Sequence, residues 1–212
     1  CSSDLEYKAH RPDPEPLLTA QKILAEDAIR IAGFQTIRVI DWEADDVLAT
    51  LAMNYSDTVI ASCDKDLLAM TGQATRCRIY HPWGDGAMMT PEEKLGVPSG
   101  QVTDYLALCG DGPDGISGVV GVGPKTAVAL LTEFGSLEAI IVAAKLGKIK
   151  GAIGEKIAAQ HEVAMTCRRV VELNTRLPLP DLEDFAPASL WQRKLQDLRL
   201  GSVAAIMDAL TG

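Results

Sequence analysis

The first half of the chain alternates between short β-branched runs and amphipathic stretches. Residues 17–32 (LLTAQKILAEDAIRIA) place apolar side chains at helical spacing and end at Gly33, so they predict a helix with a glycine cap. Strands are predicted at 36–40 (TIRVI) and 57–62 (DTVIAS), and EADDVLATLAMNY between them predicts a helix. This βαβα order predicts a parallel sheet covered by helices, in which ligands gather at the carboxyl ends of the strands.

Two local signals follow the second predicted strand. The run RCRIYHP, the turn WGDG and the run AMMT together predict a small hairpin. Thr90-Pro91-Glu92-Glu93 is a capping box with proline at the first helical position, so a helix is predicted to start there.

From about residue 97 the pattern is almost entirely helical, which predicts a second, helical subdomain. A glycine-rich loop, GDGPDGISGVVGVG, interrupts it, and LPLPDLEDFAPAS predicts an extended connector. The last residues, LWQRKLQDLRLGSVAAIMDALTG, predict two short amphipathic helices. The other helices of this half are predicted near 99–109, 124–134, 136–144 and 151–173.

Composition indicates a folded protein of the cytoplasm. The 212 residues are 47% hydrophobic, which is enough for one good core or two small ones, and no apolar run approaches the length of a membrane span. The five cysteines are widely spaced and form no C-x-x-C pair, so neither a disulfide framework nor a zinc knuckle is indicated. Aromatic residues are only 5%, which argues against a base-stacking platform for single strands.

The net charge of −9 is unevenly distributed along the chain. Residues 41–114 carry thirteen acids against four bases, and the remainder of the chain nets zero. Within that remainder, residues 145–169 carry six bases against two acids. An acidic centre beside a basic flank is what a metal-dependent enzyme acting on a polyanion needs, although a charged helix face is also common without any ligand.

Seven carboxylates form three groups that follow predicted strands or open the helical half. Taken singly, each group has an ordinary structural explanation, because acids are favoured at helix N-termini and in turns. Together they would repel one another at one sheet edge unless a cation lay between them. The groups are Glu43, Asp45 and Asp46; Asp64 and Asp66; and Asp111 and Asp114.

The chemistry of this set favours hard divalent ions. Carboxylate oxygens suit Mg²⁺ or Mn²⁺, and the absence of His and Cys from the set argues against zinc. Two such ions would let one activate a water while both stabilise the attacking and leaving oxygens of a phosphodiester. The predicted reaction is therefore phosphodiester hydrolysis.

A second motif, VGVGPKTAVALL, predicts a phosphate-binding turn. Gly121 and Gly123 permit a tight hairpin, after which Pro124 starts a helix with Lys125 and Thr126 in its first turn. The alternative is an ordinary Gly-Pro helix start. A hairpin of this kind would contact the nucleic-acid backbone, so its binding would not depend on base sequence but would depend strongly on salt.

The N-terminal segment EYKAHRPDPEP holds a third group of candidates. Tyr7, Lys8 and Arg11 are suited to contacting phosphates, or they belong to a plain polar arm.

The motifs as a set resemble the 5′ nuclease family of 5′–3′ exonucleases and flap endonucleases, and most closely the N-terminal nuclease domain of bacterial DNA polymerase I. The segments YKAHRP, WEADDVLATLA, SCDKDLLAM, TDYLALCGDGPDGISGVVGVGPKTAVALL, GSLEAI and ELNTRLPL occur in family order over nearly the whole chain. The resemblance implies a metal-dependent hydrolase that cuts DNA near a 5′-flap junction or a duplex 5′ end, in replication or repair.

The resemblance also implies an α/β fold and a role for each candidate residue. Residues 1–96 would form a PIN-like nuclease core with the end of a helical arch at about 1–16. Residues 97–186 would form a SAM-like helix-hairpin-helix subdomain, and 187–212 would pack back on the core. Two Mg²⁺ ions (or Mn²⁺) are implied, the first held by Glu43, Asp45, Asp46 and Asp64, and the second by Asp66, Asp111 and Asp114.

The remaining implied contacts are with DNA. Gly121, Gly123, Lys125 and Thr126 would grip the duplex, where the family often also binds K⁺, and Tyr7, Lys8 and Arg11 would end the arch, with Lys8 and Arg11 catalytic. The protein is expected to act as a monomer, with a DNA polymerase fused to it or as its partner.

One departure from the family leaves an alternative open. Family members begin with a strand that carries a metal-binding aspartate, and a second aspartate precedes the arch, whereas nothing before Cys1 supplies them here. We therefore expect the first segment to be missing and the first metal centre to be incomplete. The alternative is a non-catalytic DNA-binding module that has lost this centre.

Overall fold

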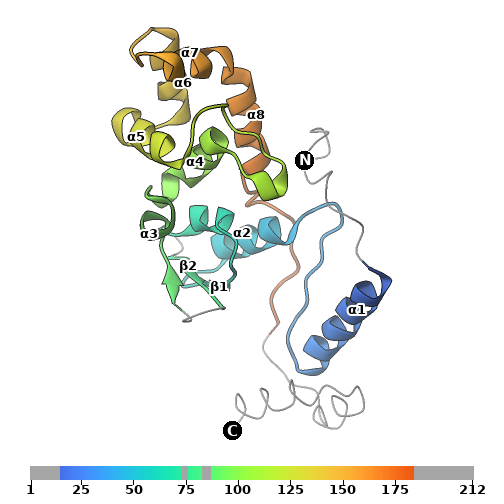
Figure 1. Cartoon of the computed structure of the whole chain (residues 1–212). Coiled ribbons are helices and arrows are strands. Elements are labelled where there is room, and N and C mark those ends of the chain that lie inside the picture. The colour runs from blue at the N-terminus through green and yellow to red at the C-terminus, as the bar shows by residue number, and fades with distance from the viewer. Residues whose placement is uncertain (1–14, 73–75, 83–86, 184–212) are drawn as a thin grey trace. The chain divides into compact units, whose positions relative to one another are not determined.

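The computed structural model describes residues 15–72, 76–82 and 87–183 (Figure 1). Within these ranges Trp42–Leu177 form one compact unit, and residues 15–41 and 178–183 belong to a second. The candidate site lies in the first unit.

The first part of this unit is a small mixed sheet with helices around it. Strands β1 and β2 pair in parallel with Ile60 opposite Ile79, and β2 and β3 pair antiparallel with Ile79 opposite Met89. Ile60 and Ile79 are buried, so the sheet has an apolar face packed on the core. The elements are α2 (Ala44–Asn54), β1 (Val59–Ala61), a 3₁₀ helix (Asp66–Met70), β2 (Arg78–Tyr80), β3 (Met88–Met89) and α3 (Pro91–Leu95).

The second part is a helical bundle around α4, which packs against α5 and α8 (Figure 1). Leu106 and Leu108 of α4 are fully buried, and one hydrophobic cluster continues from Ala49 and Ile79 through α4 to Leu131 and Ile157. The core is therefore shared between the sheet and the bundle. The helices are α4 (Val102–Cys109), α5 (Pro124–Phe134), α6 (Leu137–Lys145), α7 (Ala152–Ala159) and α8 (His161–Val171).

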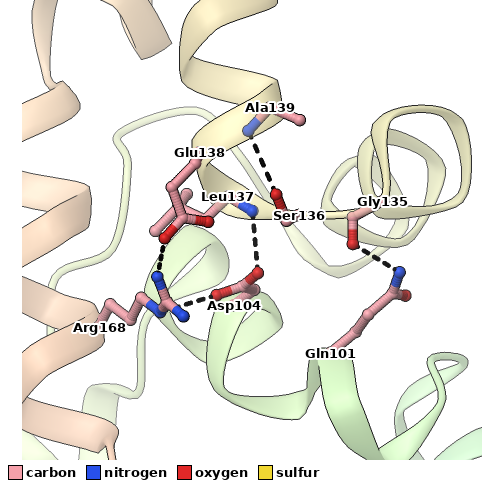
Figure 2. Close-up of polar contacts among 8 residues, drawn as sticks. All are labelled: Gln101, Asp104, Gly135, Ser136, Leu137, Glu138, Ala139 and Arg168. Atoms are coloured by element: carbon pink, nitrogen blue, oxygen red, sulfur yellow. Dashed lines mark hydrogen bonds and ion pairs between the residues drawn. The ribbon is translucent and has the colours of Figure 1, made fainter.

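An ionic network joins three of these helices at Asp104, an α4 residue only 6% exposed (Figure 2). Its carboxylate accepts a hydrogen bond of 2.9 Å from the Leu137 amide and lies 3.0 Å from Nε of Arg168 on α8. Arg168 also pairs with Glu138, and Gln101 donates to the Gly135 carbonyl at 2.8 Å. These contacts fix the start of α6 against α4 and α8.

Several predicted elements are confirmed. The first predicted helix is α1 (Pro16–Ile31), and Gly33 after it has φ +92°. Strands β2 and β3 form the predicted hairpin, whose WGDG turn lies outside the described residues. Thr90 caps α3, since its hydroxyl accepts from the Glu93 amide at 3.3 Å.

The strand predicted at 36–40 is not formed. Ile37 and Val39 are half-buried and Ile40 is 82% exposed, but this run pairs with no strand among the described residues. A β-branched run forms a strand only where a neighbouring strand completes its backbone hydrogen bonds. In this part of the second unit the Gln35 side chain makes polar contacts with the backbone. Its Nε2 donates to the Asp181 carbonyl, and its Oε1 accepts from the Glu183 amide. Periodicity alone does not show whether a neighbouring strand exists.

The single helix predicted over 151–173 is also wrong, because the chain breaks at Gln160 into α7 and α8. Gln160 has φ −108° and ψ +21°, and its side chain accepts a hydrogen bond of 3.0 Å from the Val120 amide. A side-chain contact with a distant loop thus coincides with the break, and helical periodicity does not reveal it. The two helices predicted over 187–212 lie outside the described residues.

Among the described residues, no helix alone has the length and apolar character needed to cross a membrane. Helices α5 and α6 meet that test only as a pair, and the pair is bent by 88°.

Candidate functional site

Three of the predicted acids meet although they come from two distant segments. Asp66 opens the 3₁₀ helix that follows β1, while Asp111 and Asp114 lie in the loop after α4. Each offers a carboxylate oxygen, and these oxygens lie within 4.8 Å of one another. We call Asp66, Asp111 and Asp114 the carboxylate cluster.

The loop after α4 is held by backbone contacts that position Asp111 and Asp114, two members of this cluster. Asp111 and Ile116 exchange two amide-to-carbonyl hydrogen bonds of 2.8 Å. The loop then crosses its own start at Gly118, where an added Cβ would lie 2.4 Å from the Gly110 nitrogen. The glycine is thus required at the crossing, and the turn between Asp111 and Ile116 holds Asp114.

Asp66 is the member of the cluster with the least compensation for its charge. Its Oδ1 atom is buried and has no hydrogen-bond partner among the described residues. Burial, followed by the charge of Asp64, raises the pKa of Asp66 to about 7. A bound cation would remove this penalty.

Lys65 places an ammonium group at the cluster. Its Nζ lies 2.6 Å from Oδ2 of Asp111, which is itself 7% exposed. Burial lowers the pKa of Lys65, but the hydrogen bond to Asp111 and the charges of Asp111, Asp66 and Asp64 outweigh it and raise the pKa. The sequence pattern does not single out Lys65 as a site residue, although its position between the two aspartates of DKD is a signal for it.

A second group of acids lines a small pocket that Asp66 and Asp114 also line. Glu43, Asp45 and Asp46 come from the start of α2 and line it together with Asp66 and Asp114, over a volume of about 30 Å³. Ile116 and residues 170–173 complete the lining. Five of the seven predicted carboxylates therefore share one pocket, although the strand expected before Glu43 is not formed.

Asp64 and Asp111 do not line this pocket. Asp64 forms the turn after β1, because its Oδ1 accepts a 3.0 Å hydrogen bond from the Asp66 amide. Asp111 belongs to the carboxylate cluster and contacts Lys65.

The chain after α8 closes one side of the site through contacts with α2. Oδ1 of Asp46 accepts a hydrogen bond of 2.8 Å from the Asn174 amide. The buried Thr50 hydroxyl donates to the Asn174 carbonyl and accepts from the Leu177 amide, at 3.2 and 3.3 Å. Sequence reasoning did not select Thr50 or Asn174, since their role depends on a contact between segments more than 120 residues apart in sequence.

The donor set fits a divalent metal ion of the hard class. It consists of carboxylate oxygens, one of them buried and unpartnered among the described residues, and further acids line the adjacent pocket while Lys65 contacts Asp111. The residues best placed to hold such an ion are Asp66, Asp111 and Asp114.

The predicted hairpin lies between α4 and α5 and is closed by a hydrogen bond from the Val122 amide to the Val119 carbonyl, 2.9 Å long. Gly121 has φ +93°, whereas Gly123 has φ −98° and open space where a side chain would stand. Lys125 is exposed and Thr126 half-buried in the first turn of α5. The turn thus presents backbone and one lysine to solvent.

Helix α7 supports this hairpin. Lys156 lies against Gly121, since a Cβ added there would be 2.7 Å from Nζ of Lys156. Of the predicted basic flank, Arg168 is engaged in the network with Asp104 and Glu138. The cationic surface is therefore smaller than the residue count over 145–169 indicated. Tyr7, Lys8 and Arg11 lie outside the described residues.

Comparison with known proteins places this chain in a family. The model of the 5′–3′ exonuclease N-terminal resolvase-like domain matches residues 2–96, and that of the 5′–3′ exonuclease C-terminal SAM fold matches residues 97–193.

Two relatives represent the sequence matches. Thermostable DNA polymerase I of Thermus thermophilus is 38% identical over 181 residues, which are 82% of this chain and 21% of that protein. Flap endonuclease Xni of Klebsiella pneumoniae is 36% identical over 186 residues, which are 82% of this chain and 70% of that protein. The chain thus spans about a fifth of the polymerase relatives and most of the flap endonuclease.

Solved structures agree on the fold. Bacteriophage T5 flap endonuclease, in a pseudo-enzyme–product complex with DNA and metal ions, aligns with a TM-score of 0.64 at 20% identity, covering 95% of this chain and 75% of that one. With the two domain models matching in succession and the flap endonuclease aligned over most of its length, the chain belongs to the 5′–3′ exonuclease family.

Proposed function

We propose that this chain is a structure-selective 5′–3′ exonuclease and 5′-flap endonuclease that hydrolyses DNA phosphodiesters with two divalent metal ions, Mg²⁺ in the cell. The observation that carries the proposal is the carboxylate cluster beside a pocket lined by further acids from α2. When bound, the ions supply an activated water and neutralise charge on the reacting phosphate.

The acids divide into two groups in this proposal. Asp66, Asp111 and Asp114 hold the second ion. Glu43, Asp45, Asp46 and Asp64 serve the first centre, either as ligands or by holding its water. Asp46 is positioned by the Asn174 amide, which fixes one of its two oxygens.

The hairpin binds the DNA duplex at a place separate from the metal centre. The backbone at Gly121 and Gly123 and the side chains of Lys125 and Thr126 contact phosphates of the duplex, with K⁺ at the hairpin carbonyls. These groups touch no base edge, so binding is independent of sequence. Tyr7, Lys8 and Arg11 contact the 5′ strand, and Lys8 and Arg11 assist the reaction. The protein acts as a monomer, fused to a DNA polymerase or working beside one.

The proposal is tested by separating cleavage from binding with Asp114→Asn. The substitution keeps the side-chain volume but removes one charge from the cluster. We expect cleavage of a 5′-flap duplex to fall by at least about 100-fold, as for other losses of a principal catalytic group, while the Kd for the duplex changes little. Gel-based cleavage and fluorescence anisotropy on one preparation measure the two quantities.

Asp57→Asn is the matched control. Asp57 is an exposed aspartate of the same unit with φ +58°, a conformation that asparagine tolerates well. It should retain full cleavage. If the Asp57→Asn variant cleaves the flap and the Asp114→Asn variant cleaves it equally fast, the proposed metal centre is refuted.

A further inference from the structure

Lys65 has a place at the cluster that suggests a further role, one that rests on the proposed function. It is the residue between the two aspartates of DKD, and its Nζ lies 2.6 Å from Oδ2 of Asp111. The negative charges of Asp111, Asp66 and Asp64 all stabilise the charged ammonium form. A resident cation thus already contacts one of the three carboxylates that are best placed to bind a metal ion.

An ammonium group and a divalent ion compete for the same carboxylates. One positive charge cannot balance Asp66, Asp111 and Asp114 together, so the cluster retains an excess of negative charge with Lys65 in place. A metal ion within ligand distance of Asp111 would repel the ammonium. This repulsion is strong because the partly buried surroundings screen charges less than water does. Lysine is suited to leave, because its charge is carried by a flexible four-carbon stem and the side chain is already 32% exposed.

We propose that Lys65 is an internal counter-cation, which stabilises the metal-free cluster by pairing with Asp111 and leaves Asp111 when a divalent ion binds. In the alternative arrangement Lys65 stays on Oδ2 and orients Asp111 while the ion uses other oxygens. The two arrangements predict opposite effects on the reactivity of the amine and on metal affinity.

The direct test follows the Lys65 amine in the unaltered chain. The protein is acylated at constant pH with a limiting amine reagent, in Mn²⁺ or in EDTA, and the labelling rate of each lysine is read by mass spectrometry. Displacement predicts that Lys65 is labelled several-fold faster in Mn²⁺. Lys94, an exposed lysine on α3, is the internal control and should be labelled at the same rate in both. A Lys65 rate that is unchanged or slower in Mn²⁺ overturns the proposal.

The Lys65→Met variant provides the second test, and metal binding rather than cleavage is its readout. Removing the competitor should lower the Kd for Mn²⁺ roughly five- to tenfold by calorimetry, the factor that one screened unit-charge interaction supplies. Without metal the variant should melt at a lower temperature than the parent chain. A higher or unchanged Kd would mean that Lys65 assists binding, which contradicts the proposal.

The Asp111→Asn variant distinguishes two cases: that Lys65 is not displaced by the metal ion, and that the cluster does not bind a metal ion at all. If the parent chain and Asp111→Asn bind Mn²⁺ equally weakly, the cluster is not a metal site and the proposed function falls with the inference. If only Asp111→Asn loses Mn²⁺ while the Lys65 results are negative, the centre stands and only the displacement is wrong.

Discussion

Asp104, Asp111 and Asp66 are aspartates withdrawn from solvent, and their charges are compensated to different degrees. Asp104 has a backbone amide and Arg168, and Asp111 has Lys65. One oxygen of Asp66 has no partner within the described ranges. Because burying a carboxylate is costly unless it is paired, Asp104 is structural in this fold, whereas Asp66 is the acid that an external cation would stabilise most.

The contacts of the Thr50 hydroxyl with the chain after α8 predict that Thr50→Val destabilises the fold. Thr50 is 1% exposed, and the change removes its hydroxyl, which bonds two backbone groups, at Asn174 and Leu177. Leaving those groups without a partner should cost about 1–3 kcal/mol of unfolding free energy, measured by urea denaturation. Thr132→Val on the exposed side of α5 is the control and should change stability by less than about 0.5 kcal/mol. Equal effects of the two substitutions would contradict the assigned role of Thr50.

The raised pKa of Asp104 predicts that the stability of the fold depends on pH. Burial raises its pKa in the folded state, whereas the unfolded chain titrates near the ordinary value of about 3.9. The folded protein therefore holds this proton more tightly, and the associated stabilisation is present below the unfolded pKa and lost as pH rises through the folded one. The amide of the Asp104→Asn variant does not titrate, so the unfolding free energy of the parent minus that of the variant should fall as pH rises above about 4. Urea melts of both proteins across pH measure the difference, and a rise with pH would contradict the shift.

At the scale of elements, the hairpin between α4 and α5 contains two glycines with different requirements. Gly121 needs its positive φ and lies against Lys156, while Gly123 has an ordinary φ and open space beside it. The conformation of the chain therefore requires glycine at position 121, whereas it sets no such requirement at position 123.

This difference predicts separate effects for two alanine substitutions. Gly121→Ala should lower stability by about 1–2 kcal/mol, since alanine is strained at positive φ. Gly123→Ala should leave stability unchanged or slightly raised. If the backbone at Gly123 approaches a phosphate, Gly123→Ala should still weaken duplex binding several-fold. Thermal melts and anisotropy measure the two properties, and a Gly123→Ala variant with unchanged Kd would exclude that contact.

Elements whose formation depends on local signals could be predicted from the sequence. The proline start of α5, the capping box at Thr90 and the hairpin of β2 and β3 are encoded within a few residues. The failed strand at 36–40 and the break at Gln160 depend instead on partners distant in sequence. The same distinction applies to the site, where the acids carry recognisable spacing but Lys65 and Asn174 acquire their contacts only in the fold.

At the scale of the whole molecule, a chain of net charge −9 is expected to bind a polyanion through a local cationic surface. Binding to duplex DNA should therefore weaken steeply with salt, with a log–log slope of about −0.9 for each phosphate neutralised. Lys125→Ala should reduce the magnitude of that slope by about one and weaken binding equally for unrelated sequences. Anisotropy titrations across a salt series measure the slope. An affinity loss that depends on base sequence would contradict a backbone contact.

The most direct test of the central claim is a single assay of binding and cleavage. The chain is incubated with a 5′-flap duplex in Mg²⁺ or in EDTA, and bound DNA and product length are measured from the same samples. A metal-dependent nuclease predicts a product cut near the flap junction in Mg²⁺ alone, with binding in both conditions. Binding that produces no cut in Mg²⁺, or equal cutting in EDTA, would contradict the claim that the acids of this chain form a catalytic metal site.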